Sequence, residues 1–375
     1  MSTSISSRVL VTGGAGFIGS FLTDALIERG HAVRILDTLE EQVHSGNPPS
    51  YLNPAAEFIR GDVRDSAAME NALKNIDVII HCAAAVGVGQ SQYEIKRYVD
   101  VNAGGTATLL DVIVNRKLPI RKILLPTSMT VYGEGMYLCP EHGKIRPHQR
   151  SFEALKENAW DMRCPICNVV VEPVPTPEDA LQNPATVYAL TKLWQETLLL
   201  NAGATHSIPV VAFRLFNVYG PRQSLKNPYT GVTAIFLSRL KNGQPPVIYE
   251  DGLQTRDFVS VHDVVRAFLL AMDRGEADGR VLNIGSGSGT SILAIAETLG
   301  MLTGSSIAPR VGGCRMNDIR HCTADTTKVK QLLGWQPQVS FEDGMEELVA
   351  WSREEEATDA FAAAEEILKS HHLQT

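Results

Sequence analysis

The stretch RVLVTGGAGFIG at residues 8–19 decides the fold of this chain. Its residues 9–11 form a short apolar run of the kind that a parallel strand covered on both faces needs. Gly13, Gly16 and Gly19 follow at the spacing of a nucleotide-binding turn, and a helix is expected to begin there. Glycine permits the tight turn and lets backbone amides at a helix N-terminus approach a pyrophosphate. The stretch therefore predicts a strand, turn and helix that bind a dinucleotide.

Strands alternate with helices along the first half of the chain. Apolar segments predict further strands near residues 33–37, 58–61, 77–81, 122–126 and 210–214, and a helix is expected over about 93–115. This alternation gives βαβ units and a parallel sheet. After Gly220 the pattern becomes mixed. The fold class that we expect is α/β: a Rossmann-type doubly wound parallel sheet, with a smaller mixed α/β C-terminal substrate lobe on the edge where such folds bind ligands.

The predicted domains follow from these changes of pattern. We expect the dinucleotide-binding domain to span residues 1–133 and 185–220, and the substrate lobe to span 221–352, with some of its strands returning to the first domain. Residues 134–184 are too long for a loop without function and are interpreted as an insertion. Residues 353–375 have a helical composition and are expected to form a solvated or packing tail.

The composition of the whole chain restricts its partners and its location. The net charge of the 375 residues is −8, with both signs interspersed, which argues against nucleic acid and anionic membranes as partners. The sequence contains no run of about 18 apolar residues, so no membrane span is predicted. The polar residues 1–7 do not resemble a signal peptide. We expect a cytoplasmic protein, in which cysteines are thiols or metal ligands.

The cofactor expected in the glycine turn is NAD. Asp37 lies about 20 positions after the turn, where an acidic residue accepts hydrogen bonds from the adenosine ribose and repels the 2′-phosphate of NADP. Asp62 and Val63, after the third predicted strand, suit the adenine edge, although Asp62 equally suits a helix N-cap or a turn. Ala83 and Ala84, after the fourth strand, leave room for the cofactor.

Tyr188 and Lys192 are the candidate catalytic pair. Four residues make one helical turn, so the two side chains project from one helix face. An ammonium near a phenol favours the phenolate and lowers the phenol pKa, and a phenol of lowered pKa serves as a general base or acid. A hydroxyl after the fifth strand, such as that of Ser128, can reach the same substrate oxygen as Tyr188. With a nicotinamide nearby, these groups predict the oxidation or reduction of a carbinol.

Together these motifs resemble the extended short-chain dehydrogenase/reductase family, and in particular its nucleotide-sugar epimerases. The resemblance covers nearly the whole chain and is carried by TGGAGFIG at 12–19, GDVRD at 61–65, VNAGGT at 101–106, TSMTVYG at 127–133, YALTK at 188–192, RLFNVYGPRQ at 214–223, DGLQTRDFV at 251–259, NIGSG at 283–287 and LGWQP at 333–337. Any one motif is common, whereas their joint occurrence is specific.

The resemblance implies roles for the catalytic and cofactor residues. Tyr188 would take the proton from the sugar 4-hydroxyl, Ser128 would hydrogen-bond the reacting oxygen, and Lys192 would hold the nicotinamide ribose and depress the Tyr188 pKa. Hydride would pass to bound NAD, and the 4-keto sugar would turn over before hydride returns to its other face. Residues of the matched motifs would join the cofactor site, namely Phe17, Ile18 and Asn102.

The resemblance also implies substrate contacts. Asn217 would touch the sugar or the diphosphate, and Arg256 and Arg315 would pair with the diphosphate, although either arginine also suits an ordinary salt bridge. Dehydratases of this family carry Asp-Glu at the positions of Met129 and Thr130. A thioether and a hydroxyl cannot perform that acid-base chemistry, so these residues favour reversible oxidation alone.

The insertion contains a candidate metal site. Cys139 and His142 form a CxxH pair, and Cys164 and Cys167 form a CxxC pair about 20 residues further on, as in zinc knuckles. A structural zinc ion is therefore expected. It would hold the insertion in place as a lid over the sugar pocket. The alternatives are a loop with reduced thiols or a Cys164–Cys167 redox pair.

The Cys/His segment and the run NPYTGV at 227–232 resemble a subgroup of dTDP-L-rhamnose 4-epimerases. Epimerases of UDP-glucuronate, UDP-glucose or a heptose remain alternatives, as do a 4-ketosugar reductase or dehydrogenase and an NAD-binding scaffold without activity. Members of the family pair through two helices per subunit. By this analogy we expect a homodimer formed by the helices near 93–115 and 185–203.

Overall fold

The centre of the molecule is a parallel sheet of seven strands. The computed structural model describes residues 6–315 and 317–374. The strand order is β13-β9-β5-β4-β1-β2-β3, the order of a doubly wound nucleotide-binding sheet extended by one strand. The strands are β1 Arg8–Thr12, β2 Ala32–Asp37, β3 Glu57–Arg60, β4 Val78–His81, β5 Lys122–Ser128, β9 Val210–Leu215 and β13 Arg280–Ile284. The expected α/β fold is confirmed, and β13 is a strand of the C-terminal half that returns to the first domain.

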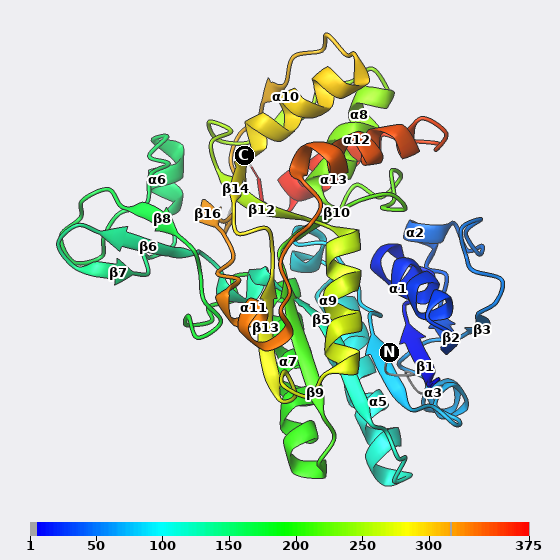
Figure 1. Ribbon diagram of the computed structural model, residues 1–375. Helices are drawn as coiled ribbons and strands as arrows, with labels where there is room; N and C mark the ends of the chain where they lie inside the picture. Colours follow the sequence, from blue (N-terminus) through cyan, green and yellow to red (C-terminus); the bar gives the residue numbers. More distant parts are fainter. Residues whose placement is uncertain (1–5, 316, 375) are drawn as a thin grey trace.

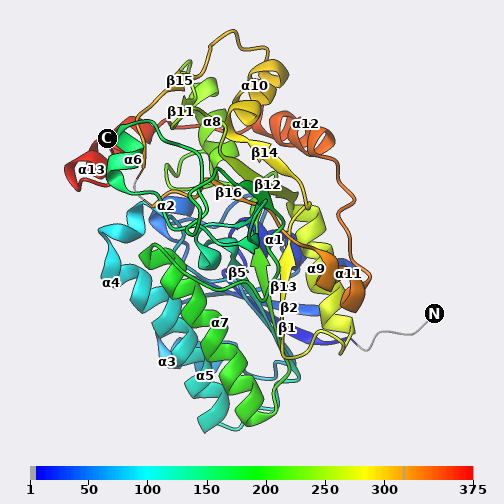
Figure 2. The same cartoon turned by 90° about the vertical axis from the view of Figure 1, so that its left-hand side faces the viewer.

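Helices cover both faces of this sheet (Figures 1 and 2). Val9 and Val11 pack in one buried cluster and Leu10 in the other, as the alternation of side chains along a strand requires. The first cluster is completed by α1 Phe17–Glu28, α9 Val261–Asp273 and α11 Thr327–Leu333, and the second by α3 Ser66–Ala72, α5 Gly105–Asn115 and α7 Val187–His206. No helix of the described residues is long and apolar enough to cross a membrane.

The helix expected over residues 93–115 is not one regular helix. It begins as α4 Ile95–Tyr98, widens into the π-helical segment η2 Val99–Gly104 and continues as α5. The π-turn contains the fully buried Asn102, whose amide is used inside the fold rather than at the surface. Such turns concentrate near functional sites.

A smaller lobe lies over the carboxyl ends of the sheet strands. Its sheet joins β10 Asn217–Tyr219, β12 Thr255–Ser260, β14 Gly289–Ser291 and β16 His321–Cys322, and β11 Val247–Ile248 pairs with β15 Arg310–Val311. Helices α8 Val232–Lys241, α10 Ile292–Thr303 and α12 Phe341–Ser352 share a third buried cluster with these strands. The last helix, α13 Phe361–Ser370, packs against the lobe through Phe361, which shares a buried cluster with Val247 and Tyr249.

The insertion forms a separate antiparallel sheet that projects to one side of the molecule (Figure 1). Its strands are β6 Met136–Cys139, β7 Gly143–Ile145 and β8 Glu172–Val174, in the order β7-β6-β8, and α6 Phe152–Lys156 follows β7. Its core is small and consists of Tyr137, Cys139, Met162, Cys164 and Val171. A core of five side chains buries little apolar surface, so this sheet needs another source of stability.

Candidate active site

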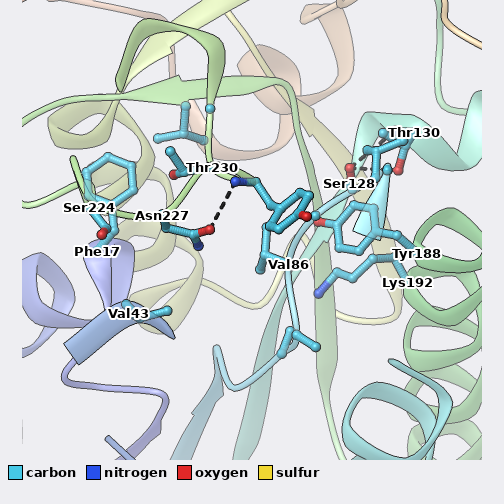
Figure 3. Close-up of a pocket in the computed structure, with 18 of the residues that line it drawn as sticks. Phe17, Val43, Val86, Ser128, Thr130, Tyr188, Lys192, Ser224, Asn227 and Thr230 are labelled. Carbon is cyan, nitrogen blue, oxygen red and sulfur yellow. Dashed lines mark hydrogen bonds between the residues drawn. The ribbon is translucent and has the colours of Figure 1, made fainter. Parts of the chain in front are cut away.

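A cavity of about 650 Å³ lies beyond the carboxyl ends of the sheet strands, under the smaller lobe. It brings together most of the site residues that the sequence predicts, which are Gly13, Gly16, Phe17, Ile18, Gly19, Asp37, Asp62, Val63, Ala83, Ala84, Ser128, Met129, Thr130, Tyr188, Lys192, Asn217, Arg256 and Arg315. Figure 3 shows Ser128, Tyr188 and Lys192 together at one side of it, with Phe17 and Ser224 opposite.

The glycine turn leaves no room for a side chain at Gly13 or Gly19. Gly13 has a φ of +69°, and a Cβ there would meet the backbone nitrogen of Ala83 at 2.7 Å. A Cβ on Gly19 would meet the Gly13 carbonyl oxygen at 2.2 Å. Helix α1 begins at Phe17, and its first intrahelical bond is donated by Ser20 to the Gly16 carbonyl. The amides of Phe17, Ile18 and Gly19, in the first turn of α1, therefore face the helix N-terminus, where they can bind an anion such as a pyrophosphate.

Asp37 ends β2 beside this turn. Its Oδ2 accepts the Ala15 amide at 3.1 Å and its Oδ1 accepts the Leu39 amide at 2.9 Å. These bonds fix the carboxylate at the cavity wall, and each oxygen retains a lone pair for a ribose hydroxyl. Arg97, a cation of the same wall, is paired with Glu40 and Glu94 at 3.2 and 2.6 Å.

Asp62 forms a turn and does not cap a helix. Its carboxylate accepts the Arg64 amide at 2.8 Å and pairs with the Arg64 guanidinium at 2.6 Å. The Arg64 hydrogen bonds lower the pKa of Asp62. The N-cap of α3 is Asp65 instead. Asp62 and Val63 both line the cavity, as the prediction for the adenine edge requires.

Asn102 supports the cofactor wall from behind. Unlike the other predicted cofactor residues, it does not line the cavity. Its side chain accepts the Ala85 amide at 2.7 Å, donates to the Ala85 carbonyl at 3.1 Å, and donates to the Thr191 hydroxyl at 2.9 Å. It thereby fixes the 82–85 segment against α7. Asn102 therefore supports the cofactor wall, and its side chain is not placed to contact the cofactor directly.

Tyr188 and Lys192 project from the first turns of α7, as their spacing predicts. Thr186 caps this helix by accepting the Ala189 amide at 3.2 Å, and the Tyr188 amide donates to Ser91 at 3.0 Å. Burial raises the pKa of Tyr188 to about 12, and a hydrogen bond with Ser128 offsets part of this shift. The expected depression of the Tyr188 pKa by Lys192 is therefore absent from the protein alone, because desolvation of the phenolate outweighs the other effects.

Ser128 ends β5 and lies beside Tyr188 at the same side of the cavity. Its hydroxyl oxygen accepts the Thr130 amide at 3.2 Å and the Thr130 hydroxyl at 2.9 Å. Both interactions leave the Ser128 hydrogen free to donate toward the phenol or toward a substrate oxygen. Met129 is buried beside it, so the two positions after Ser128 supply no carboxylate.

Lys192 is a buried cation held by two acceptors. Only 4% of the residue is exposed, and its Nζ donates to the Pro126 carbonyl at 2.7 Å and to Gln195 Oε1 at 2.8 Å. Burial lowers its pKa to about 8, against the opposing influence of Cys82 and Glu196. The ammonium form therefore predominates at neutral pH, although burial makes it less stable relative to the neutral amine.

A chain of buried hydrogen bonds extends from Lys192 to the strand that precedes the glycine turn. The Gln195 amide donates to Thr106 Oγ1 at 3.0 Å, and His81 lies between Thr106 at 3.1 Å and Thr12 at 2.8 Å. Burial and the charge of Lys192 lower the pKa of His81 to about 3. The imidazole is therefore neutral, and it adds no second cation beside Lys192.

The two predicted diphosphate arginines also line the cavity. Arg256 donates to the Asp318 carboxylate at 2.8 Å. The Arg315 guanidinium lies 4.2 Å from the centre of the Tyr249 ring and donates to its hydroxyl at 3.1 Å, while its buried Nε has no partner among the described residues. Asn217 begins β10 and also lines the cavity. A salt bridge is thus present at Arg256, in a place where a diphosphate would compete with it.

Two segments that sequence reasoning did not assign to the site close the cavity. One is the loop 223–231, where Asn227 accepts a hydrogen bond from Gln42 at 2.9 Å. The other is α13 with its tail, whose lining residues are Phe361, Ala364, Glu365, Leu368 and Leu373. Helix α13 was expected to be solvated or packing. Its apolar spacing was the available signal, but periodicity does not reveal which surface such a face covers.

The predicted metal ligands lie together, away from the cavity. One ligand atom from each of Cys139, His142, Cys164 and Cys167 lies within 4.8 Å of the others. The Cys139 sulfur is 3.6 Å from the Cys167 sulfur and 3.5 Å from His142 Nδ1, which is 3.7 Å from the Cys164 sulfur. All six cysteines are free of disulfides.

Comparison with known proteins gives one family. The family model described as the NAD dependent epimerase/dehydratase family matches residues 9–152 and 170–285. The interval between the two matched parts lies in the insertion and contains Cys164 and Cys167.

The chain is similar to several characterised proteins over nearly its whole length. It is 37% identical to dTDP-L-rhamnose 4-epimerase of Burkholderia thailandensis, over 93% of this chain and 95% of that protein. It is 31% identical to UDP-N-acetyl-alpha-D-glucosaminuronate decarboxylase of Bacillus cytotoxicus, over 93% and 99%. Its structure resembles UDP-glucose 4-epimerase of Thermotoga maritima with UDP-glucose, with a TM-score of 0.76 and 32% identity over 92% and 98% of the two chains.

Replacing the buried ammonium should stabilise the fold in a pH-dependent way. The pKa of Lys192 falls from its ordinary 10.5 to about 8 on folding, so the folded state binds fewer protons between these pH values. The charged Lys192 therefore destabilises the folded state most below pH 8, and this destabilisation disappears as the pH rises through 10.5. We expect Lys192→Met to raise the free energy of unfolding by up to about 3 kcal/mol at pH 7, less the value of two hydrogen bonds.

Urea denaturation at pH 7, 8.5 and 10 measures this effect. The stability difference between Lys192→Met and the parent chain should shrink across the series. Lys74→Met, which replaces an exposed lysine of the same charge, should show no such trend. A Lys192→Met difference that stayed constant from pH 7 to 10 would contradict the depressed pKa.

Proposed function

We propose that this chain, which belongs to the NAD dependent epimerase/dehydratase family, is a 4-epimerase of nucleotide-diphosphate sugars. One observation carries the proposal: Tyr188, Ser128 and Lys192 share a cavity with the glycine turn and Asp37. The turn, the carboxylate and the small residues Ala83 and Ala84 fit NAD. NAD, when bound, accepts hydride from C4 of the sugar and returns it, and its cationic ring favours the phenolate of Tyr188.

The protein's own groups then handle one proton and the position of the sugar. Tyr188 Oη takes the proton of the sugar 4-hydroxyl and later returns it to the same oxygen. Ser128 Oγ donates a hydrogen bond to that oxygen, and Lys192 supplies a fixed positive charge at the edge of the site. Arg256 and Arg315 hold the diphosphate, so that the sugar can turn while its anchor stays bound. The reaction needs no further acid or base, which agrees with the absence of a carboxylate at Met129 and Thr130.

dTDP-L-rhamnose is the first substrate to test. The proposal is supported by the 37% identity to the Burkholderia enzyme of that name and by the walls of the cavity. Val86 and Val88 are exposed apolar side chains that line it. A 6-deoxy sugar presents a methyl group, for which apolar walls are suitable, whereas the carboxylate of a uronic acid requires a cation or several donors.

Tyr188→Phe tests the reaction directly. Incubation of the parent chain with dTDP-L-rhamnose and a panel of UDP-sugars, without added cofactor, should give a 4-epimer detectable by NMR. Tyr188→Phe removes only the proton-transfer group, so it should retain bound NAD and lose activity by roughly 10²- to 10⁴-fold. Net NADH production without an epimer would instead indicate a dehydrogenase. Biological activity that survives Tyr188→Phe would indicate a scaffold.

We also propose that the Cys/His cluster holds a structural zinc ion. In a tetrahedral site with Zn–S bonds of 2.3 Å the ligand atoms are about 3.8 Å apart, close to the separations of 3.5 to 3.7 Å in the cluster. Four protein ligands leave no open position, so the ion would be structural. It would supply the stability that the small core of the insertion lacks.

Elemental analysis of protein purified without chelator should find about one zinc ion per chain. Cys164→Ser should lower the zinc content well below one ion, since three ligands remain. Cys314→Ala, which changes a buried cysteine outside the cluster, should leave the zinc content unchanged. A parent chain without metal would remove the zinc site.

A homodimer through α7 is the third proposal. Leu190, Trp194 and Leu198 are 38%, 45% and 39% exposed, and their spacing of four residues makes one apolar stripe along this helix. Ile95 of the neighbouring α4 is also exposed. An apolar stripe on two adjacent helices is suited to the same stripe of a second copy.

Light scattering coupled to size exclusion should find a dimer for the parent chain. Trp194→Glu buries a charge in the proposed interface and should give a monomer. Met301→Glu alters a residue that is 75% exposed on α10 and should leave the dimer intact. A monomeric parent chain, or a dimeric Trp194→Glu chain, would contradict this interface.

A further inference from the structure

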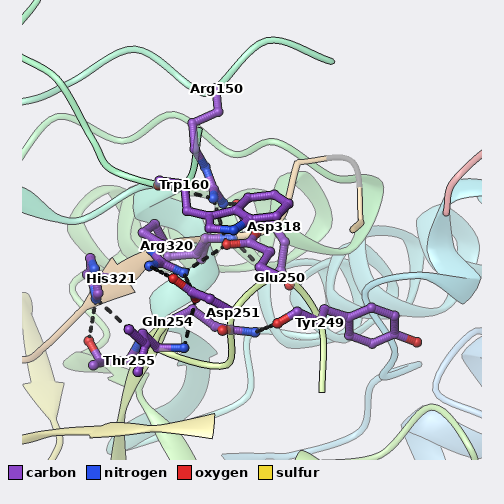
Figure 4. A network of polar contacts seen from close by, with 12 residues as sticks. Arg150, Trp160, Tyr249, Glu250, Asp251, Gln254, Thr255, Asp318, Arg320 and His321 are labelled. Carbon is purple, nitrogen blue, oxygen red and sulfur yellow. Dashed lines mark hydrogen bonds and ion pairs between the residues drawn. The ribbon is translucent and has the colours of Figure 1, made fainter. Parts of the chain in front are cut away.

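The insertion is attached to the arginine end of the cavity by a buried ionic cluster (Figure 4). Arg150, which follows β7, donates from Nη1 to Glu250 Oε2 at 2.7 Å. The same carboxylate oxygen accepts Arg320 Nη1 at 3.0 Å, and Arg320 also pairs with Asp251 at 2.6 Å. The side chains of Arg150, Glu250 and Arg320 are only 6%, 1% and 3% exposed. Two cations thus face two anions, and the charges are balanced only because the insertion contributes one of the two arginines.

Arg150 holds both segments that form the arginine wall. Glu250 directly follows Tyr249, the ring under Arg315. The other Arg150 nitrogen, Nη2, donates to the backbone carbonyl of Asp318 at 3.2 Å. The carboxylate of Asp318 accepts Arg256 at 2.8 Å. One guanidinium therefore reaches both the residue that pairs with Arg256 and the residue that follows Tyr249, the contact of Arg315.

The insertion carries Arg150 on its own framework and has a second point of attachment. Arg150 Nη1 also approaches the Trp160 carbonyl at 3.4 Å, four residues before Cys164. Tyr137, a member of the insertion core, donates to Glu134 at 2.8 Å. Glu134 accepts the backbone amides of Arg320 and His321, both at 2.8 Å. A movement of the insertion would reach the wall through both routes.

We propose that the insertion is a brace for the diphosphate-binding wall and that Arg150 is its positioning residue. Arg150 lies outside the cavity lining, so its effect is exerted through Glu250 and Asp318. Its loss leaves Glu250 sharing Arg320 with Asp251 in a buried place, where an uncompensated charge is costly. The segments then relax, and the two diphosphate arginines lose their alignment. NAD binds on the sheet side and is unaffected. The inference rests on the proposed function, because it assigns this wall to the diphosphate.

The test compares Arg150→Ala with Arg163→Ala. Arg163 belongs to the same insertion and carries the same charge, but it is exposed and donates to the Asn168 carbonyl within the insertion. Calorimetric titration with dTDP, UDP, GDP and CDP measures the affinity of the wall. NAD content after denaturation measures the cofactor site. Arg150→Ala should weaken nucleoside diphosphate binding by roughly tenfold, the usual size of coupling between sites, and retain the NAD content of the parent chain. Arg163→Ala should match the parent chain in both.

Kinetics with the epimerase substrate separate positioning from general damage. Arg150→Ala should raise KM for the nucleotide sugar while kcat changes little, because the proton-transfer groups are untouched. An unchanged diphosphate affinity in Arg150→Ala, or a loss of NAD equal to the loss of diphosphate affinity, would overturn the brace. If Arg150→Ala does not fold, Arg150→Lys decides: weaker binding at an unchanged melting temperature supports the inference, and unchanged binding refutes it.

The binding measurement also keeps this inference distinct from the proposed reaction. A parent chain that binds a nucleoside diphosphate but epimerises no nucleotide sugar would refute the reaction and leave the brace testable. A parent chain that epimerises a sugar, together with an Arg150→Ala chain of parental affinity, would refute only the brace. A parent chain that binds none of the four nucleoside diphosphates would overturn the assignment of the wall and the brace with it.

Discussion

An ammonium that must stay charged inside the fold is the constraint on which the site depends. Lys192 is nearly inaccessible to water, so its charge has to be carried by fixed acceptors, and Pro126 and Gln195 provide them. Gln195 is oriented in turn by Thr106, and Thr106 and Thr12 hold the neutral His81 between them. A charged imidazole there would repel Lys192. Polar side chains at the ends of β1 and β4 and a backbone carbonyl of β5 thus support one cation, which explains polar side chains in otherwise apolar strands.

The same burial shifts the pKa values of the two proposed catalytic groups in opposite directions. It lowers the pKa of Lys192 and raises that of Tyr188, because it disfavours an ammonium and a phenolate alike. Spacing along a helix predicts that the two side chains are neighbours, but it says nothing about the water that surrounds them. The protein alone therefore keeps the phenol protonated. Coupling its ionisation to cofactor binding would keep an unused active site in its resting form.

The parts of the fold that the sequence predicts are those with local causes. The glycine turn follows from the lack of a Cβ at Gly13 and Gly19, and the strands follow from their apolar runs. The catalytic residues follow from spacing and from family resemblance. The π-turn at Asn102 was missed because one extra residue per turn leaves no mark on a polar and small-residue segment. The covering role of α13 was missed because its apolar face meets residues more than one hundred positions away, such as Tyr249 and Gly89.

The proposed brace would let a segment with a weak core of its own serve a binding wall. Five buried side chains cannot fix its sheet with the rigidity of the main domain. A closed metal site would compensate by joining β6 to the CxxC turn, and the ionic cluster at Arg150 would transmit that rigidity. The wall needs this rigidity because Arg256 is already paired with Asp318. A diphosphate must displace or share that partner, and it can do so at low cost only if both arginines are already in place. Rigidity supplied from outside the cavity meets this requirement without adding any group to the space that a turning sugar needs.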